Sequence, residues 1–81
     1  MVSKYVGGRW IAKCAYREVD KFIRQNRHLS NEALLVLIKE KLTLLIIRQI
    51  HKEILRHDTD YLKAVIERLQ FYKDNLEREN K

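Results

Sequence analysis

Apolar residues recur along the chain with helical spacing in three successive stretches. In the first, residues 9–26, apolar side chains return every three or four positions, which places them on one face of a helix. The residues of this face are Ile11, Cys14, Ala15, Val19, Phe22 and Ile23. In the last stretch, residues 59–78, apolar residues follow one another at intervals of three, four, three and four, from Leu62 to Leu76. This is a heptad pattern, typical of helices that pack along a seam. The sequence therefore predicts helices over 9–26 and 59–78, each with one buried face.

The middle stretch, residues 31–56, predicts a helix that is apolar on all sides. Ser30 can cap its first turn, and Glu32 lies where a negative charge suits the helix dipole. Aliphatic residues from Leu34 to Leu45 point in every direction around such a helix, which therefore has to be enclosed. Two neighbouring helices cannot cover it completely. We expect an all-α, three-helix arrangement around this buried central helix, completed by homodimerisation.

The small size of the chain also favours self-association. A domain of 81 residues buries only about 60% of its unfolded surface. Cys14 is the one cysteine, so no disulfide can form within the chain. Oligomerisation is then the remaining means of stabilising it. The side chains expected at the dimer interface are Val36, Ile47, Ile50, Ile54, Leu62, Val65, Leu69, Tyr72 and Leu76.

Short segments flank the single helical domain, residues 9–78. Residues 1–8 are expected to form an N-terminal arm, because Gly7 and Gly8 lose too much conformational entropy to lie inside a helix. Residues 79–81 are expected to fray, as chain ends commonly do.

A break is expected between the second and third helices, near residues 57–60. Asp58 or Thr59 can cap the following helix, and Asp60 then lies in its first turn. The alternative is one continuous helix, since no proline or glycine stands at this point.

The net charge of +6 is concentrated in the first third of the chain. Residues 1–29 contain seven basic and two acidic residues, whereas residues 58–81 contain five basic and six acidic ones. A solvated face commonly mixes both signs, so this asymmetry favours a surface that binds a polyanion. Within 9–26 the basic residues step by three or four and form a stripe opposite the apolar face. The residues expected to contact nucleic acid are Lys4, Arg9, Lys13, Arg17, Lys21, Arg24 and Arg27.

These observations predict a nucleic-acid-binding regulatory or accessory protein that contacts phosphates through the first helix, with DNA slightly favoured over RNA. The alternative is a helical interaction module or inhibitor that docks on an acidic partner protein. Attachment to an anionic membrane is disfavoured, because Cys14, Ala15 and Val19 suit helix packing better than insertion.

No catalytic residue, cofactor or metal site is expected from the sequence. His51 and His57 are six residues apart, which places them on different sides of a helix, and capping explains Asp58 and Asp60. Cys14 belongs to the apolar face and is expected to be a buried small side chain. We therefore expect a protein that is not an enzyme.

The chain shows no signal for export or membrane insertion. Arg9 and Lys13 interrupt the apolar region near the start, and no uncharged apolar run approaches the roughly 18 residues of a membrane span. A cytoplasmic location, or the cytoplasm of a host, is the expectation.

Overall fold

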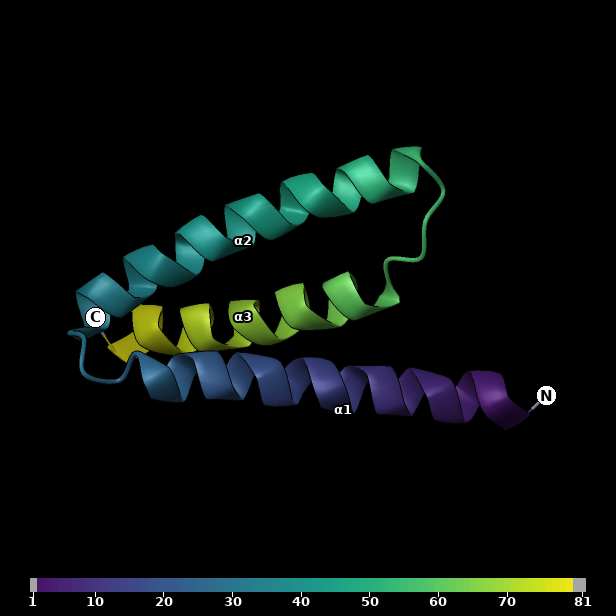
Figure 1. Cartoon of the computed structure of the whole chain (residues 1–81). Helices are drawn as coiled ribbons and strands as arrows, with labels where there is room; N and C mark the ends of the chain where they lie inside the picture. Colours follow the sequence, from purple (N-terminus) through teal and green to yellow (C-terminus); the bar gives the residue numbers. More distant parts are fainter. Residues whose placement is uncertain (1, 80–81) are drawn as a thin grey trace.

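The computed structural model describes residues 2–79, and for residues 2–9 the course of the backbone alone. It consists of three α-helices: α1, Val2–Gln25; α2, Asn31–Ile54; and α3, Asp60–Glu79. No strand occurs among the described residues, which confirms the predicted all-α fold. Figure 1 shows the three helices side by side, with α3 between α1 and α2.

The helix with neighbours on two sides is α3, and not the second helix as the sequence suggested. α3 packs against α1 and against α2, whereas the Cα atoms of the described parts of α1 and α2 stay more than 8 Å apart. The core follows α3, and its largest fully buried side chains are Val19, Ile38 and Leu69, one from each helix. The buried cluster consists of Ala15, Val19, Ile23, Leu34, Ile38, Leu42, Val65, Ile66 and Leu69.

The heptad row of α3 lies in the core of a single chain. Leu62, Val65 and Leu69 are buried, and Tyr72 and Leu76 pack, partly buried, against the core cluster. Full burial of one such aliphatic side chain contributes about 1.5–3 kcal/mol, and α1 and α2 already provide this burial within one chain. These five residues therefore belong to the core of a single chain, and their assignment to a dimer interface stays a prediction. Periodicity showed that the face is buried but not which helix covers it.

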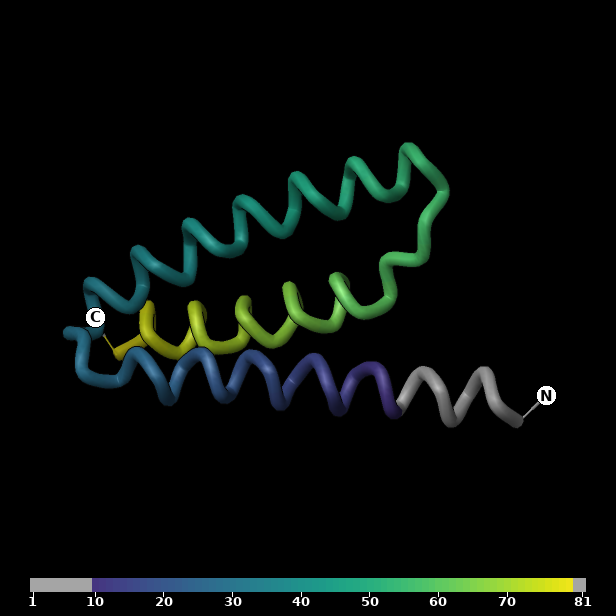
Figure 2. The backbone as a smooth tube through the Cα atoms, viewed as in Figure 1, coloured from purple at the N-terminus to yellow at the C-terminus, as the bar shows by residue number. Residues whose placement is uncertain are grey.

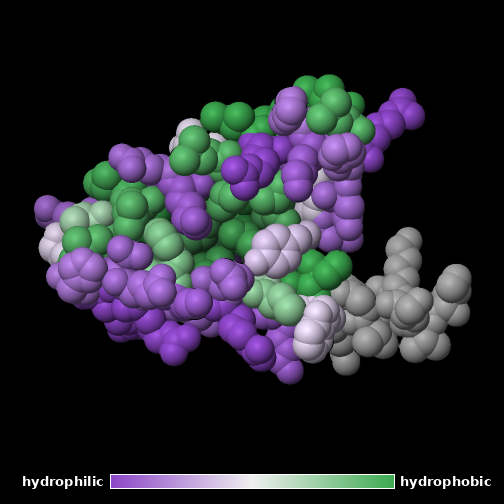
Figure 3. Space-filling model, in the orientation of Figure 1, coloured by the Kyte–Doolittle hydropathy of each residue, from purple (hydrophilic) through white to green (hydrophobic). Residues whose placement is uncertain are grey.

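α2 buries only one of its sides. Leu34, Ile38 and Leu42 are buried on that side. The opposite row consists of Val36, Ile47, Ile50 and Ile54, which are 56, 59, 53 and 71% exposed. Figure 3 shows hydrophobic side chains gathered along the edge formed by α2 and hydrophilic ones along the edge formed by α1. The expected enclosure of α2 is therefore not met within one chain, because α1 lies on the far side of α3. Its coverage by a second chain stays a prediction.

α1 extends over most of the predicted arm. The helix begins at Val2 and not near residue 9, so it includes Gly7 and Gly8. A glycine costs about 1 kcal/mol relative to alanine inside a helix, but each residue added to an existing helix also forms one more backbone hydrogen bond. The two glycines therefore do not end the helix. Residues 1, 80 and 81 of the predicted arm and tail lie outside the described residues.

Capping bonds fix both connections where the sequence indicated them. Ser30 Oγ accepts a hydrogen bond from the amide of Ala33 at 3.2 Å, at the start of α2. Asp58 Oδ1 accepts one from the amide of Asp60 at 3.0 Å, at the start of α3. The intervening residues, 55–59, are not helical, which confirms the predicted break. α2 then diverges from α3 toward this connection, as Figure 2 shows.

Arg56 adopts a left-handed conformation directly after α2, with φ of 61°. The amide of His57 donates to the carbonyl of Lys52 at 2.8 Å, and the amide of Arg56 donates to that of Glu53 at 3.0 Å. This is the Schellman arrangement, in which glycine usually occupies the left-handed position. Glycine fits there because it has no Cβ to approach the following carbonyl.

We predict that Arg56→Gly raises the free energy of unfolding by about 0.5–1 kcal/mol, because the steric cost of the left-handed residue disappears while the unfolded chain gains some entropy. Urea denaturation followed by circular dichroism measures this difference. Arg56→Ala is the matched control, since it removes the same charge but keeps Cβ. An equal gain in both variants would attribute the effect to charge and contradict the steric explanation.

Candidate polyanion-binding groove

The packing of α1 on α3 leaves the basic side of α1 in solvent. Ala15, Val19 and Ile23 are buried in the core. On the remaining surface of α1 and in the turn after it, five basic side chains are exposed: Lys13, Arg17, Lys21, Arg24 and Arg27. The hydrophilic edge of the molecule in Figure 3 is formed by this helix. The exposed side of α1 therefore forms a surface of concentrated positive charge, as its amphipathic sequence predicts.

An open groove of about 520 Å³ runs along the contact between α1 and α3. We call it the basic groove. It is lined by Lys13, Tyr16, Arg17, Asp20, Ile23, Arg24, Arg27, Arg68 and Tyr72. Five of these nine residues are cations and one is a carboxylate, so the groove has a strong excess of positive charge.

The structure brings four of the seven predicted contact residues together in the basic groove: Lys13, Arg17, Arg24 and Arg27. Lys21 lies on the other edge of α1 and lines a different groove. The side chains of Lys4 and Arg9 lie outside the described part of the chain. The stripe is therefore divided between two surfaces.

Arg68 reaches the basic groove from α3 and is held there by Asp20 of α1. Arg68 Nε donates to Asp20 Oδ1 at 3.1 Å, and Nη2 donates to Oδ2 at 3.5 Å. The hydroxyl of Tyr72 donates to the same Oδ1 at 2.6 Å. The carboxylate thus joins two α3 side chains to α1. Sequence reasoning missed Arg68 and Tyr72, because they lie 48 and 52 positions from Asp20 and no local spacing relates them.

Three aromatic rings surround the guanidinium of Arg68. Its central carbon lies 4.8 Å from the ring centroid of Phe71, 5.2 Å from that of Tyr16 and 5.3 Å from that of Tyr72. The rings of Phe71 and Tyr72 meet edge to face, with centroids 5.6 Å apart. Such cation–π contacts restrain the guanidinium in addition to its ion pair. Arg68 is therefore fixed in place and joins α1 to α3.

The charge state of Asp20 follows from these contacts. Burial raises the pKa of Asp20, but hydrogen bonds from Tyr72 and Arg68, together with the charges of Arg68 and Arg24, outweigh it and leave the pKa below its ordinary value. The hydrogen bond to Asp20 raises the pKa of Arg68, whereas burial is the main cause that raises the pKa of Tyr72. Asp20 is anionic at neutral pH and neutralises one cation of the groove.

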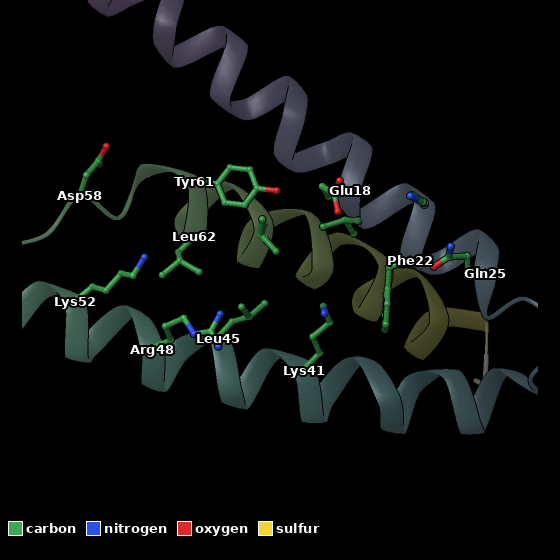
Figure 4. Close-up of a pocket in the computed structure, with 13 residues that line it drawn as sticks. Glu18, Phe22, Gln25, Lys41, Leu45, Arg48, Lys52, Asp58, Tyr61 and Leu62 are labelled. Atoms are coloured by element: carbon green, nitrogen blue, oxygen red, sulfur yellow. The ribbon is translucent and has the colours of Figure 1, made fainter.

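A second groove lies between α1 and α2, with α3 beneath it (Figure 4). We call this groove, of about 460 Å³, the apolar groove, after the aliphatic and aromatic side chains in its lining. The apolar lining residues are Val19, Phe22, Leu45, Tyr61, Leu62 and Val65, and the charged or polar ones are Glu18, Lys21, Gln25, Lys41, Arg48, Lys52 and Asp58. In Figure 4, Lys41, Arg48 and Lys52 extend from α2 toward the other two helices. Four cations face two carboxylates here, so the excess positive charge is half that of the basic groove.

The described residues with metal-binding or nucleophilic side chains do not form a site. His51 and His57 are exposed. Within the described residues, no group of three or more His, Cys, Asp or Glu side chains could hold a metal ion. Cys14 is half-buried, and so less enclosed than expected. None of the described helices combines the length and the apolar content needed to cross a bilayer.

Comparison of the chain with protein-family models, with curated proteins and with solved structures gave no significant match. The geometry and charge of the two grooves are therefore the features from which function is inferred.

We predict that Asp20→Asn lowers the free energy of unfolding by about 1 kcal/mol at neutral pH, because the ion pair with Arg68 is lost from a partly exposed site. The lowered pKa of Asp20 means that its contribution is present above the unfolded pKa, near 4, and is lost as the pH falls through the folded value. The difference between the two proteins should therefore shrink below about pH 4. Urea denaturation at neutral and acid pH measures it.

Asp74→Asn provides the matched control, since Asp74 is an exposed carboxylate of α3 outside the cluster. It makes the same change of charge without breaking the contact between α1 and α3. Equal losses of stability in Asp20→Asn and Asp74→Asn, with the same pH dependence, would show that the cluster contributes nothing specific.

Proposed function

We propose that the protein is a non-enzymatic nucleic-acid-binding factor, with a regulatory or accessory role, that contacts backbone phosphates through the basic groove. This proposal is based on the difference between the one paired cation of the basic groove and its four unpaired cations. Arg68 is paired with Asp20 and enclosed by rings, whereas the other four cations, three on α1 and Arg27 in the turn after it, are exposed and have no ion-pair partner among the described residues. Unpaired cations of this kind neutralise phosphates and release their condensed counterions.

The spacing of these cations supports phosphate contact. Lys13 and Arg24 are eleven positions apart, which corresponds to about 16 Å of helix, and Arg27 follows in the turn after α1. The same length of duplex axis covers about five base-pair steps at about 3.4 Å each. The four side chains can therefore reach several phosphates of one strand. Contacts of this type position a protein on nucleic acid without specifying a base sequence.

We predict that binding weakens steeply with salt, and that four phosphate contacts give a log–log slope of about −3.6 on duplex DNA, at about −0.9 per contact. Lys13→Gln/Arg17→Gln removes two contacts and should reduce the slope to about −1.8 while lowering the affinity at low salt. Fluorescence anisotropy with labelled duplex DNA, single-stranded DNA and RNA, each at several salt concentrations, measures both quantities.

Arg48→Gln/Lys52→Gln is the matched control, because it removes the same charge from the apolar groove. Its salt slope should remain that of the unaltered protein. Equal weakening in both double variants would mean that net charge alone attracts the nucleic acid. Failure of the unaltered protein to bind any of the three probes at low salt would overturn the proposal, and circular dichroism verifies that each variant is folded.

Binding of an acidic amphipathic helix from a partner protein is the second candidate function. The apolar groove favours it, because an apolar interior with a cationic rim complements such a helix in shape and charge. This function depends on Arg48 and Lys52, and the nucleic-acid function depends on Lys13 and Arg17. Titration of the two double variants with an acidic amphipathic peptide therefore distinguishes the two functions.

Homodimerisation adds to the proposed function without being required for it. A dimer presents two basic grooves, and attachment of one raises the effective concentration of the other at the same nucleic acid. The exposed row on α2, formed by Val36, Ile47, Ile50 and Ile54, supports self-association because monomeric proteins rarely expose a long apolar row.

A further inference from the structure

The exposed side of α2 has the spacing of a helix-pairing surface. Its positions follow one another at intervals of four, three, four, three and four residues, which is the a and d pattern of a coiled coil. We call this row the α2 seam; it consists of Val36, Glu40, Thr43, Ile47, Ile50 and Ile54. All six side chains are exposed, while Leu34, Ile38 and Leu42, on the opposite side of the helix, are buried. The seam can therefore pair without any change in the core.

The α2 seam is symmetric about Leu45. Each of its positions has a counterpart at the same distance on the other side of this residue. The three pairs are Val36 with Ile54, Glu40 with Ile50, and Thr43 with Ile47. In two antiparallel helices related by a two-fold axis at Leu45, the members of each pair fall into the same layer, so every a position meets a d position. Leu44 and Ile46, which are exposed beside the seam, then each lie near their own copy at the axis.

The charges beside the α2 seam select the antiparallel orientation. Lys39 and Glu53 occupy equivalent flanking positions fourteen residues apart, so antiparallel pairing places Lys39 of one copy beside Glu53 of the other, twice over. Parallel pairing would instead place Glu40 against Glu40 of the second copy across the seam. Like charges at such a position repel each other, and opposite charges at flanking positions fix the orientation of helix pairs.

We propose that the protein forms an antiparallel homodimer through the α2 seams of two copies. The two-fold axis crosses the seam at the level of Leu45. The occupant of the exposed apolar face of α2 is thus a second copy of this chain. The basic groove, on the α1 side of α3, lies outside this interface. The dimer therefore does not depend on the proposed function, and it is tested without nucleic acid.

Disulfide trapping tests the orientation directly. Cys14 is the one native cysteine, so Cys14→Ser leaves only the introduced thiols, in Val36→Cys or in Ile54→Cys. In the antiparallel dimer the two copies of position 36 are about 27 Å apart along the seam, far beyond the roughly 7 Å that a disulfide spans between Cα atoms. Neither variant should cross-link alone, and an equal mixture should give the dimer on a non-reducing gel. Cross-linking of each variant by itself would indicate parallel pairing and overturn the proposal.

A charge exchange provides the second measurement. Lys39→Glu should weaken the dimer, because two glutamates then face each other, and Lys39→Glu/Glu53→Lys should restore it. Residues 39 and 53 lie about 21 Å apart along one helix, so restoration can come only from contact between copies. Multi-angle light scattering reports the mass, which is twice 9.8 kDa for the dimer. A single-chain mass for the unaltered protein up to its solubility limit, or no restoration in the double variant, would refute the proposal.

Discussion

The packing of α1 and α2 on opposite sides of α3 is the constraint on which the rest of the structure depends. Because α1 buries Ala15, Val19 and Ile23 in this packing, its basic side has to face solvent. Because α3 covers only one side of α2, the α2 seam stays exposed. The basic groove and the proposed dimer surface are thus two consequences of one arrangement of helices, in which the central helix separates the charged surface from the apolar one (Figures 1 and 3).

Apolar contacts, rather than charges, hold this arrangement together. One fully buried aliphatic side chain contributes about 1.5–3 kcal/mol, whereas a partly exposed ion pair contributes about 0–1 kcal/mol. The pair of Asp20 and Arg68 therefore matters less for stability than for the distribution of charge. By pairing with Arg68, Asp20 neutralises the cation that comes from α3 and leaves those of α1 unpaired. As a result, the positive charge that remains unpaired in the basic groove lies along α1 and the turn after it.

The sequence predicted the helices and their buried faces better than it predicted which helices pack against each other. The cap at Ser30, the break before α3 and the buried faces of α1 and α3 depend on local spacing, which is visible in one chain. Which helix covers which face depends on contacts between distant positions, and so the core row of α3 around Leu69 was assigned to a dimer. The pairing of Asp20 with Arg68 could not be predicted for the same reason.

Two further differences have simple physical causes. Gly7 and Gly8 lower helix propensity, but a propensity of about 1 kcal/mol per residue does not decide a boundary by itself. Lys21 has the spacing of the basic stripe, but side chains at intervals of three and four spread over a broad part of the helix surface. Lys21 therefore points to a different side of α1 from Lys13 and Arg17 and lines the apolar groove.

The most direct test of the claim that the exposed cations of the basic groove form the binding surface is a magnetic resonance titration of the isotope-labelled protein with a short DNA duplex. We expect saturable shifts grouped on the signals of Lys13, Arg17, Arg24 and Arg27, while those of Arg48 and Lys52 in the apolar groove stay unchanged. Shifts of equal size in both groups, or none that saturate, would contradict it.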